Sequence, residues 1–209
     1  MEELNIIYED ENIIGIIKPY GVLSCGENSI ESKLKIYNGG YIGVVHRLDR
    51  TTQGVMIFSK NQKTTSYLST LIKEHKINKE YYAIVEGYLE KESDTLNDLL
   101  FFDRKVNKSF VVKKERKGIK LAKLYYEVID RKNDMSLLKI RLFTGRTHQI
   151  RVQFSNLHHP LIGDRRYGSK TECNNIMLTS SHISFYDEQS KKEIDLSFNP
   201  SNEYFGEFL

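Results

Sequence analysis

The chain has 209 residues, of which 39% are hydrophobic, with 13 Tyr and 10 Phe but no Trp. This length is enough for one domain with a substantial hydrophobic core, and the low counts of 3 Pro and 13 Gly argue against a long disordered linker. The formal net charge of +3, from 31 Lys and Arg against 28 Asp and Glu, is too small to diagnose a nucleic-acid-binding protein by itself.

The cysteines and the apolar runs exclude several protein classes. Cys25 and Cys173 lie far apart and form no CxxC pair, so we expect neither a disulfide framework nor a zinc site. The acidic start at residues 1–5 differs from the basic opening of a signal peptide, and apolar runs such as residues 13–17 are far too short to span a bilayer. The sequence therefore predicts a soluble cytoplasmic protein with no membrane partner.

The first part of the chain alternates between predicted strands and predicted helices. Pro19 and Gly21 end the second strand, because proline cannot continue a ladder and glycine permits a turn. The longest predicted helix, over residues 61–75, carries an apolar face that includes Leu68 and Leu71. The expected strands are residues 4–8, 13–17, 42–48, 54–59 and 81–85, and the expected helices are residues 30–37 and 61–75.

The second part of the chain is predicted to be rich in hairpins. An apolar piece over residues 99–102 precedes two alternating segments, 124–129 and 136–142, which should pair across a turn. A helix over residues 147–157 is followed by two last strands, at residues 182–186 and 194–198. The excess of strands over helices and the short turns favour a single α+β domain, residues 1–209, built on a largely antiparallel sheet.

The positive charge is concentrated in one segment, residues 104–123. This segment holds nine basic residues and one acid, Glu115, so it carries +8 and the remaining chain carries −5. Phe101, Phe102 and Phe110 lie beside or within it, and cations combined with aromatic faces are typical of RNA-binding grooves. We interpret the segment, with Lys113 and Lys114, as a hairpin or loop that contacts RNA. The alternative is a solvated basic hairpin.

A candidate reacting carboxylate lies in the block at residues 46–50 (HRLDR). If this block is extended, Arg47 and Asp49 project from one face while Leu48 anchors the other face in the core. A carboxylate near Arg47, Arg50 or another arginine stays ionised, and an ionised, oriented carboxylate can act as a nucleophile or a base. The alternative is an Asp49 that only forms a turn before residues 51–52.

A second polar block, residues 145–151 (GRTHQIR), lies where the helix over residues 147–157 should begin. Ile150, Phe154 and Leu157 share one side of this helix, and His148 and Arg151 lie on the other. Arg151 is a candidate phosphate ligand beside the helix N-terminus, with a surface ion pair as the alternative. We interpret His148 as structural or RNA-binding.

Four blocks in this sequence resemble those of the RluA-type pseudouridine synthases, and they occur in the family's order. They are residues 18–21 (KPYG), residues 46–60 (HRLDRTTQGVMIFSK), residues 79–87 (KEYYAIVEG), and residues 145–152 (GRTHQIRV) with 159–164 (HPLIGD) and 167–168 (YG). The resemblance extends from about residue 8 to residue 198. It implies isomerisation of uridine in ribosomal or transfer RNA to pseudouridine, without a cofactor or a metal. It also implies a pseudouridine synthase fold, with a curved, mixed, mainly antiparallel sheet, flanking helices and a central cleft.

The resemblance also implies roles for individual residues. Asp49 matches the family's essential aspartate, Tyr81 its active-site tyrosine, and Arg146 the basic residue that pairs with the aspartate. Arg47 matches the arginine that occupies the gap left when the target base is flipped out. We place Arg50, His148, Arg151, Lys113 and Lys114 with Arg47 among the RNA-binding residues.

The sequence departs from the family pattern in two places. Only 48 residues precede Asp49, so we expect no N-terminal RNA-binding module of the S4 type. The C-terminal block is altered at residues 178–185 (LTSSHISF). A monomeric enzyme with RNA as its partner is the leading hypothesis. The alternatives are an RNA-binding or RNA-folding factor whose catalysis is not essential, and a glycoside or nucleoside hydrolase, which would need a second acidic group.

Overall fold

A computed structural model describes residues 4–115, 117–201 and 204–209 of the chain. The described residues form two compact units: the first lies within Met1–Lys79 and Thr179–Pro200, and the second lies within Glu80–Leu178 and Ser201–Leu209. None of the helices in the described ranges is long and apolar enough to cross a membrane. The prediction of one domain over residues 1–209 stays a prediction.

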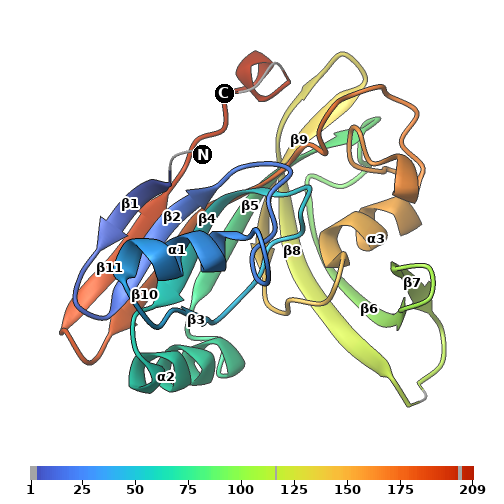
Figure 1. Ribbon diagram of the computed structural model, residues 1–209. Coiled ribbons are helices and arrows are strands. Elements are labelled where there is room, and N and C mark those ends of the chain that lie inside the picture. The colour runs from blue at the N-terminus through green and yellow to red at the C-terminus, as the bar shows by residue number, and fades with distance from the viewer. Residues whose placement is uncertain (1–3, 116, 202–203) are drawn as a thin grey trace. The chain divides into compact units, whose positions relative to one another are not determined.

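The first unit is built on a mixed sheet in which the strands run in the order β1, β2, β4, β10, β11. The pair β4–β10 is parallel, and the other pairs are antiparallel; β3 pairs with the end of β4. The strands are β1 (Asn5–Glu9), β2 (Ile13–Lys18), β3 (Gly43–Val44), β4 (Gln53–Ser59), β10 (Leu178–Asp187) and β11 (Lys192–Ser197). The helices are α1 (Ile30–Asn38) and α2 (Gln62–Lys73) (Figure 1).

The core of the first unit forms between the sheet and α2. Leu68 and Leu71 of α2 pack with Val55 and Ile57, which alternate along β4 and therefore share one face of the strand. Asn61 caps the start of α2 by accepting a hydrogen bond from the backbone of Thr64. The expected helices at residues 30–37 and 61–75 are thus confirmed, with ends that differ by up to two residues.

Gly54 is required where β4 begins to pair with β10. Its φ of 122° lies in a region that side chains rarely adopt. A Cβ atom at this position would overlap the backbone carbonyl oxygen of Ser180, the residue that pairs with Gly54. Glycine is therefore needed here for the close approach of two parallel strands rather than for a turn.

The second unit contains an antiparallel sheet with the strand order β5, β9, β8, β6, β7. The helix α3 (Gln149–Asn156) covers part of it: Val152 packs against Leu100 and Ala122, and Phe154 meets the ring of Tyr126 edge-on. Figure 1 shows β8 as a long, curved strand. The strands are β5 (Asn78–Glu86), β6 (Ser93–Asp103), β7 (Lys108–Val112), β8 (Ile119–Lys132) and β9 (Met135–Leu142).

The α+β class and the mainly antiparallel pairing are confirmed, and so is the hairpin expected from residues 124–129 and 136–142. Several boundaries differ. The apolar piece at residues 99–102 is part of the longer β6, and β8 begins five residues before the expected start. The helix expected from residue 147 begins only at Gln149, because His148 has the left-handed backbone conformation, with φ of 54°.

Candidate active site

The segment that carries Asp49 is held by side chains and not by strand pairing. The expected strand over residues 42–48 pairs with β4 only at Gly43–Val44. Beyond it, the Ser24 hydroxyl donates to the carbonyl oxygen of Leu48 at 2.7 Å and accepts from its backbone nitrogen at 3.0 Å. Side-chain groups therefore satisfy the backbone that a neighbouring strand would otherwise bind, which corrects the strand prediction.

His46 is a second side chain that binds backbone where a strand would otherwise pair. Its Nε2 atom accepts a hydrogen bond from the backbone nitrogen of Ile57 in β4 at 3.1 Å. Burial and, to a smaller extent, the positive charge of Lys79 lower the pKa of His46 to about 3. The ring is therefore neutral, with Nε2 free to accept. His46 opens the block that contains Asp49, but its residue type and position alone do not predict this contact.

The alternation expected around Asp49 is present despite the missing strand. Arg47 is exposed, Leu48 is 7% exposed, and Asp49 is half-buried. The carbonyl oxygen of Asp49 accepts from the backbone nitrogen of Thr52 at 3.0 Å, so Asp49 begins the turn that leads into β4. The structure thus gives the Asp49 backbone the turn role that was the alternative interpretation.

Lys18, the last residue of β2, is a buried cation close to Asp49. Its side chain is fully buried, and its Nζ atom donates to the carbonyl oxygens of Pro19 and Val22, both at 2.8 Å. Burial lowers the pKa of Lys18 to about 8, and the negative charge of Asp49 opposes this shift. Sequence reasoning missed this residue, although it opens the block at residues 18–21.

We expect Lys18 to give folding stability a measurable pH dependence. A lysine whose pKa is about 8 when folded and about 10.4 when unfolded penalises the folded state below pH 8. That penalty is relieved as pH rises from about 8 to about 10.4, at about 1.4 kcal/mol per pH unit. Urea unfolding from pH 7 to 10 should therefore show the unmodified chain gaining stability relative to Lys18→Met. The exposed Lys63→Met is the control, and parallel curves for Lys18→Met would contradict the assignment.

Arg50 lies on the surface and links the Asp49 turn to the loop after β2. Its Nε atom donates to the carbonyl oxygen of Gly21 at 2.7 Å, and the backbone nitrogen of Gly21 donates to the carbonyl oxygen of Arg50 at 2.9 Å. Gly21 has φ of 80°, so the turn after Pro19 needs a glycine, as the sequence predicts. The RNA contact expected of Arg50 stays a prediction.

Tyr81 and Tyr82 occupy opposite faces of β5 in the second unit. Tyr82 packs against the cluster of buried residues that includes Ile84 and Leu137. Tyr81, which pairs in register with Ile140 of β9, points to the other face and is 6% exposed. Tyr81 is therefore the more buried of the two rings, and its role in the reaction stays a prediction.

The loop before α3 holds Arg146. The side-chain oxygen of Gln149 accepts from the backbone nitrogen of Arg146 at 3.0 Å and from the Thr144 hydroxyl at 2.8 Å. The Nε atom of Arg146 donates to the carbonyl oxygen of Leu121 in β8 at 2.9 Å. The buried Gln149 thus ties the two ends of the loop together, while strand β8 holds the guanidinium.

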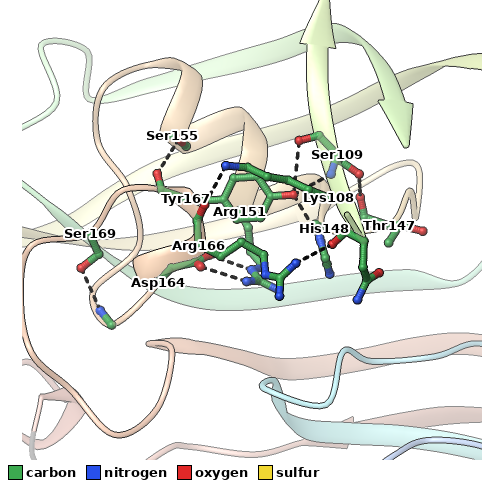
Figure 2. A network of polar contacts seen from close by, with 12 residues as sticks. Lys108, Ser109, Thr147, His148, Arg151, Ser155, Asp164, Arg166, Tyr167 and Ser169 are labelled. Atoms are coloured by element: carbon green, nitrogen blue, oxygen red, sulfur yellow. Dashed lines mark hydrogen bonds and ion pairs between the residues drawn. The ribbon is translucent and has the colours of Figure 1, made fainter. Parts of the chain in front are cut away.

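Arg151 lies inside the second unit and not on its surface. It is 5% exposed, and it forms two hydrogen bonds with the carboxylate of Asp164, at 2.7 and 2.9 Å (Figure 2). His148 precedes α3 without capping it, and its Nδ1 atom lies 3.0 Å from the Tyr167 hydroxyl oxygen. We therefore propose a structural role for Arg151, in place of the expected phosphate contact.

The basic segment at residues 104–123 forms a hairpin followed by the start of β8. Its chain turns between β6 and β7, continues through β7, and enters β8 at Ile119. Lys113 and Lys114 are exposed between β7 and β8, and Arg116 lies outside the described residues. The hairpin expected from the sequence is thus present. Its contact with RNA stays a prediction.

The candidate residues are divided between the two units. Asp49 belongs to the first unit, and Tyr81 and Arg146 belong to the second, so the meeting of these three residues stays a prediction. Among residues 4–115, 117–201 and 204–209, no group of three or more His, Cys, Asp and Glu is arranged to hold a metal ion.

Comparison with known proteins identifies the family. A sequence model described as RNA pseudouridylate synthase matches residues 12–156. The chain is 34% identical to the ribosomal large subunit pseudouridine synthase D of Borreliella burgdorferi, over 97% of this chain and 64% of that protein. It is 30% identical to the tRNA pseudouridine synthase C of Haemophilus ducreyi, over 93% of this chain and 90% of that protein.

The fold agrees with this result. The structure of human RNA Pseudouridylate Synthase Domain Containing 1 matches with a TM-score of 0.81 at 20% identity, covering 96% of this chain and 84% of that one. The chain spans less than two thirds of the length of the Borreliella relative. The family match includes the blocks that hold Asp49, Tyr81 and Arg146. The chain therefore belongs to the RNA pseudouridylate synthase family.

Proposed function

We propose that this chain isomerises specific uridines in ribosomal or transfer RNA to pseudouridine. The observation that carries the proposal is the family match over residues 12–156, which includes both polar blocks singled out in the sequence. The names of two relatives refer to ribosomal large subunit and to tRNA pseudouridine synthases. The reaction breaks the N1–C1′ bond of uridine and joins C1′ to C5 of the same base, while C5 loses a proton and N1 gains one. No oxidant or reductant is therefore consumed.

Asp49 is the proposed reacting carboxylate. It would attack C1′ of the ribose, or assist formation of a glycal intermediate. Its position supports both roles, since a half-buried side chain at the start of a fixed turn is accessible yet oriented. The buried ammonium group of Lys18 adds a positive charge close to Asp49.

Tyr81 and Arg146 are the proposed partners of Asp49. Tyr81 would stack on the flipped base and move a proton, and Arg146 would pair with the carboxylate of Asp49. The near-complete burial of Tyr81 on strand β5 supports a fixed position for its ring. The exposed Arg47, two residues from Asp49, would occupy the gap that the extruded base leaves. We place this reaction in the cytoplasm, with the chain acting as a monomer.

Mapping pseudouridine across total RNA tests this function. RNA from cells that lack the gene should lose pseudouridine at one or a few defined uridines. The purified chain should restore those sites when it is added to that RNA without cofactor or metal. Identical pseudouridine maps with and without the gene, together with no activity in vitro, would refute the proposal.

The basic segment should contribute affinity for RNA without affecting chemistry. Replacing Lys113 and Lys114 together by alanine removes two charges from an exposed loop, so log Kd plotted against log salt should lose a slope of about 2. Filter binding from 50 to 300 mM salt measures this slope, and the single-turnover rate at saturating enzyme should stay nearly unchanged. The double variant of Lys191 and Lys192 is the charge-matched control, and equal slopes would remove the segment from the interface.

A further inference from the structure

The loop that carries Arg146 is fastened to the basic segment by strand β8. The backbone nitrogen of Lys123 donates to the Thr144 hydroxyl at 2.8 Å, and the backbone nitrogen of Thr144 donates to the carbonyl oxygen of Lys123 at 3.2 Å. The Nε atom of Arg146 binds the carbonyl oxygen of Leu121, two residues earlier in β8. The start of the loop therefore depends on the position of a strand that begins within the basic segment.

Strand β7 fastens the other end of the same loop through Tyr167. The buried Tyr167 hydroxyl accepts from the backbone nitrogen of Ser109 in β7 at 2.8 Å and lies 3.0 Å from Nδ1 of His148. The hydroxyl of Ser109 donates to the carbonyl oxygen of Thr147 at 2.5 Å. Figure 2 shows Ser109 and His148 at the Tyr167 hydroxyl, and Thr147 joined to Ser109.

Hydrogen bonds join the tip of the hairpin formed by β6 and β7 to the turn that holds Tyr167. Lys108 donates from Nζ to the carbonyl oxygen of Arg166 at 2.8 Å, and its ammonium group lies 5.0 Å from the centre of the Tyr167 ring. In return, the Arg166 guanidinium donates to the carbonyl oxygens of Val106 and Asn107, at 2.9 and 3.0 Å. Movement of the hairpin tip therefore acts directly on Tyr167.

His148 makes the loop sensitive to this link. Its φ of 54° lies in the left-handed region, which is unfavourable for residues other than glycine and persists only where neighbouring contacts hold it. Its contact with the Tyr167 hydroxyl is one of those contacts. Relaxation of His148 would move Arg146, two residues earlier, and a displacement of about 1 Å at a reacting group can cost about 100-fold in rate.

We propose that Tyr167 is a positioning residue for Arg146, which couples contact between RNA and the basic hairpin to the placement of the Arg146 guanidinium. This rests on the proposed function, in which Arg146 pairs with Asp49. Loss of the Tyr167 hydroxyl then leaves RNA affinity intact and slows the chemical step. The family blocks at residues 145–152 and 167–168 thus act together, because they supply His148 and Tyr167, the two sides of one contact.

Tyr167→Phe tests the proposal, with Tyr126→Phe as the matched control, because Tyr126 is also buried in this unit but lies outside the hydroxyl network. The single-turnover rate at saturating enzyme should fall about 10- to 100-fold for Tyr167→Phe only, with the RNA Kd unchanged within about twofold. In an Arg146→Ala background, Tyr167→Phe should cause no further loss, because it acts through Arg146. A full additional loss in that background would overturn the proposal.

Hydrogen exchange separates this inference from the proposed function. In the protein alone, amides of residues 105–112 and 144–149 should exchange faster in Tyr167→Phe than in Tyr126→Phe, because the hydroxyl bonds that join them are lost. Unmodified transfer RNA transcripts should slow exchange at residues 144–149 in Tyr126→Phe but not in Tyr167→Phe. A chain that forms no pseudouridine would refute the function but still show this pattern. Equal exchange in both variants would overturn the coupling even in an active enzyme.

Discussion

Replacing Asp49 by asparagine is expected to lower the single-turnover rate of pseudouridine formation by at least about 1,000-fold, with RNA binding unchanged within about twofold. Asparagine keeps the size of the side chain, and the turn depends on the backbone carbonyl oxygen of residue 49, so the fold should persist. What is lost is the negative charge and the nucleophilic oxygen. Rapid-quench assays with the uridine site found by mapping, combined with filter binding, measure the two quantities separately.

A control variant and an analysis of the product make the Asp49→Asn experiment more specific. Asp195→Asn removes an exposed carboxylate of the same unit and should leave the rate unchanged. Analysis of the product distinguishes the reaction classes, since a hydrolase would release free uracil whereas the synthase keeps the base in the RNA. If Asp49→Asn formed pseudouridine at an undiminished rate, the carboxylate would have no catalytic role, and the alternative of an RNA-binding factor would gain support.

The parts of the fold that the sequence predicts well are those where the core sets a local pattern. In β4 and α2 the buried residues recur with the period of the element, as Val55 and Ile57 do in the strand and Leu68 and Leu71 do in the helix. The predicted ends of these elements agree with the structure to within two residues. The buried faces of β4 and α2 pack against each other in the folded chain, so the apolar pattern of each element reflects this contact.

The start of β8 could not be read in this way. Its first residues do not alternate regularly, because Lys120 and Leu121 are both exposed and are followed by the small, buried Ala122. The strand exists there because it pairs with β6, where Leu100 lies opposite Lys120 and Asp98 lies opposite Ala122. The paired residues of β6 and β8 lie far apart in the sequence, so their pairing leaves no periodic pattern in β8 itself. The positive charge is therefore the main feature that the sequence of this segment offers.

In the candidate site, too, some features follow from the local sequence and others do not. The position of Asp49 and the alternation around it follow from the sequence, because Leu48 must reach the core. The burial of Lys18 does not, since lysine is almost never fully buried and its partners are backbone carbonyl oxygens that no side-chain pattern reveals. The contact of His46 cannot be predicted either, because its partner is the backbone nitrogen of Ile57.

Arg151 shows the limit of a helical-face argument. Periodicity correctly placed Ile150 and Phe154 in the core and placed Arg151 on another side of α3. That side is not exposed to solvent, because the chain after the helix returns and brings Asp164 against it. A helical projection contains the helix alone, so it cannot show a later segment that covers the polar face.

Breaking the pair formed by Arg151 and Asp164 is expected to have the largest effect on stability. Arg151→Met leaves the Asp164 carboxylate, which is 1% exposed, without its bidentate partner, and loss of one member of a buried ion pair costs about 3–5 kcal/mol of unfolding free energy. Asp164→Asn should also destabilise the fold, because it removes the carboxylate that both of these hydrogen bonds reach. Urea unfolding followed by circular dichroism measures both values.

The double variant Arg151→Met with Asp164→Leu decides whether charge isolation is the cause. Removing both charges should restore much of the stability lost in either single variant, because no buried charge remains unpaired. RNA binding separates this role from the phosphate contact expected from the sequence: a phosphate ligand at position 151 would make the salt slope of Arg151→Met smaller by about 1. An unchanged slope together with a large loss of stability assigns Arg151 to the scaffold that holds the Arg146 loop. A reduced slope with unchanged stability would return Arg151 to the RNA interface.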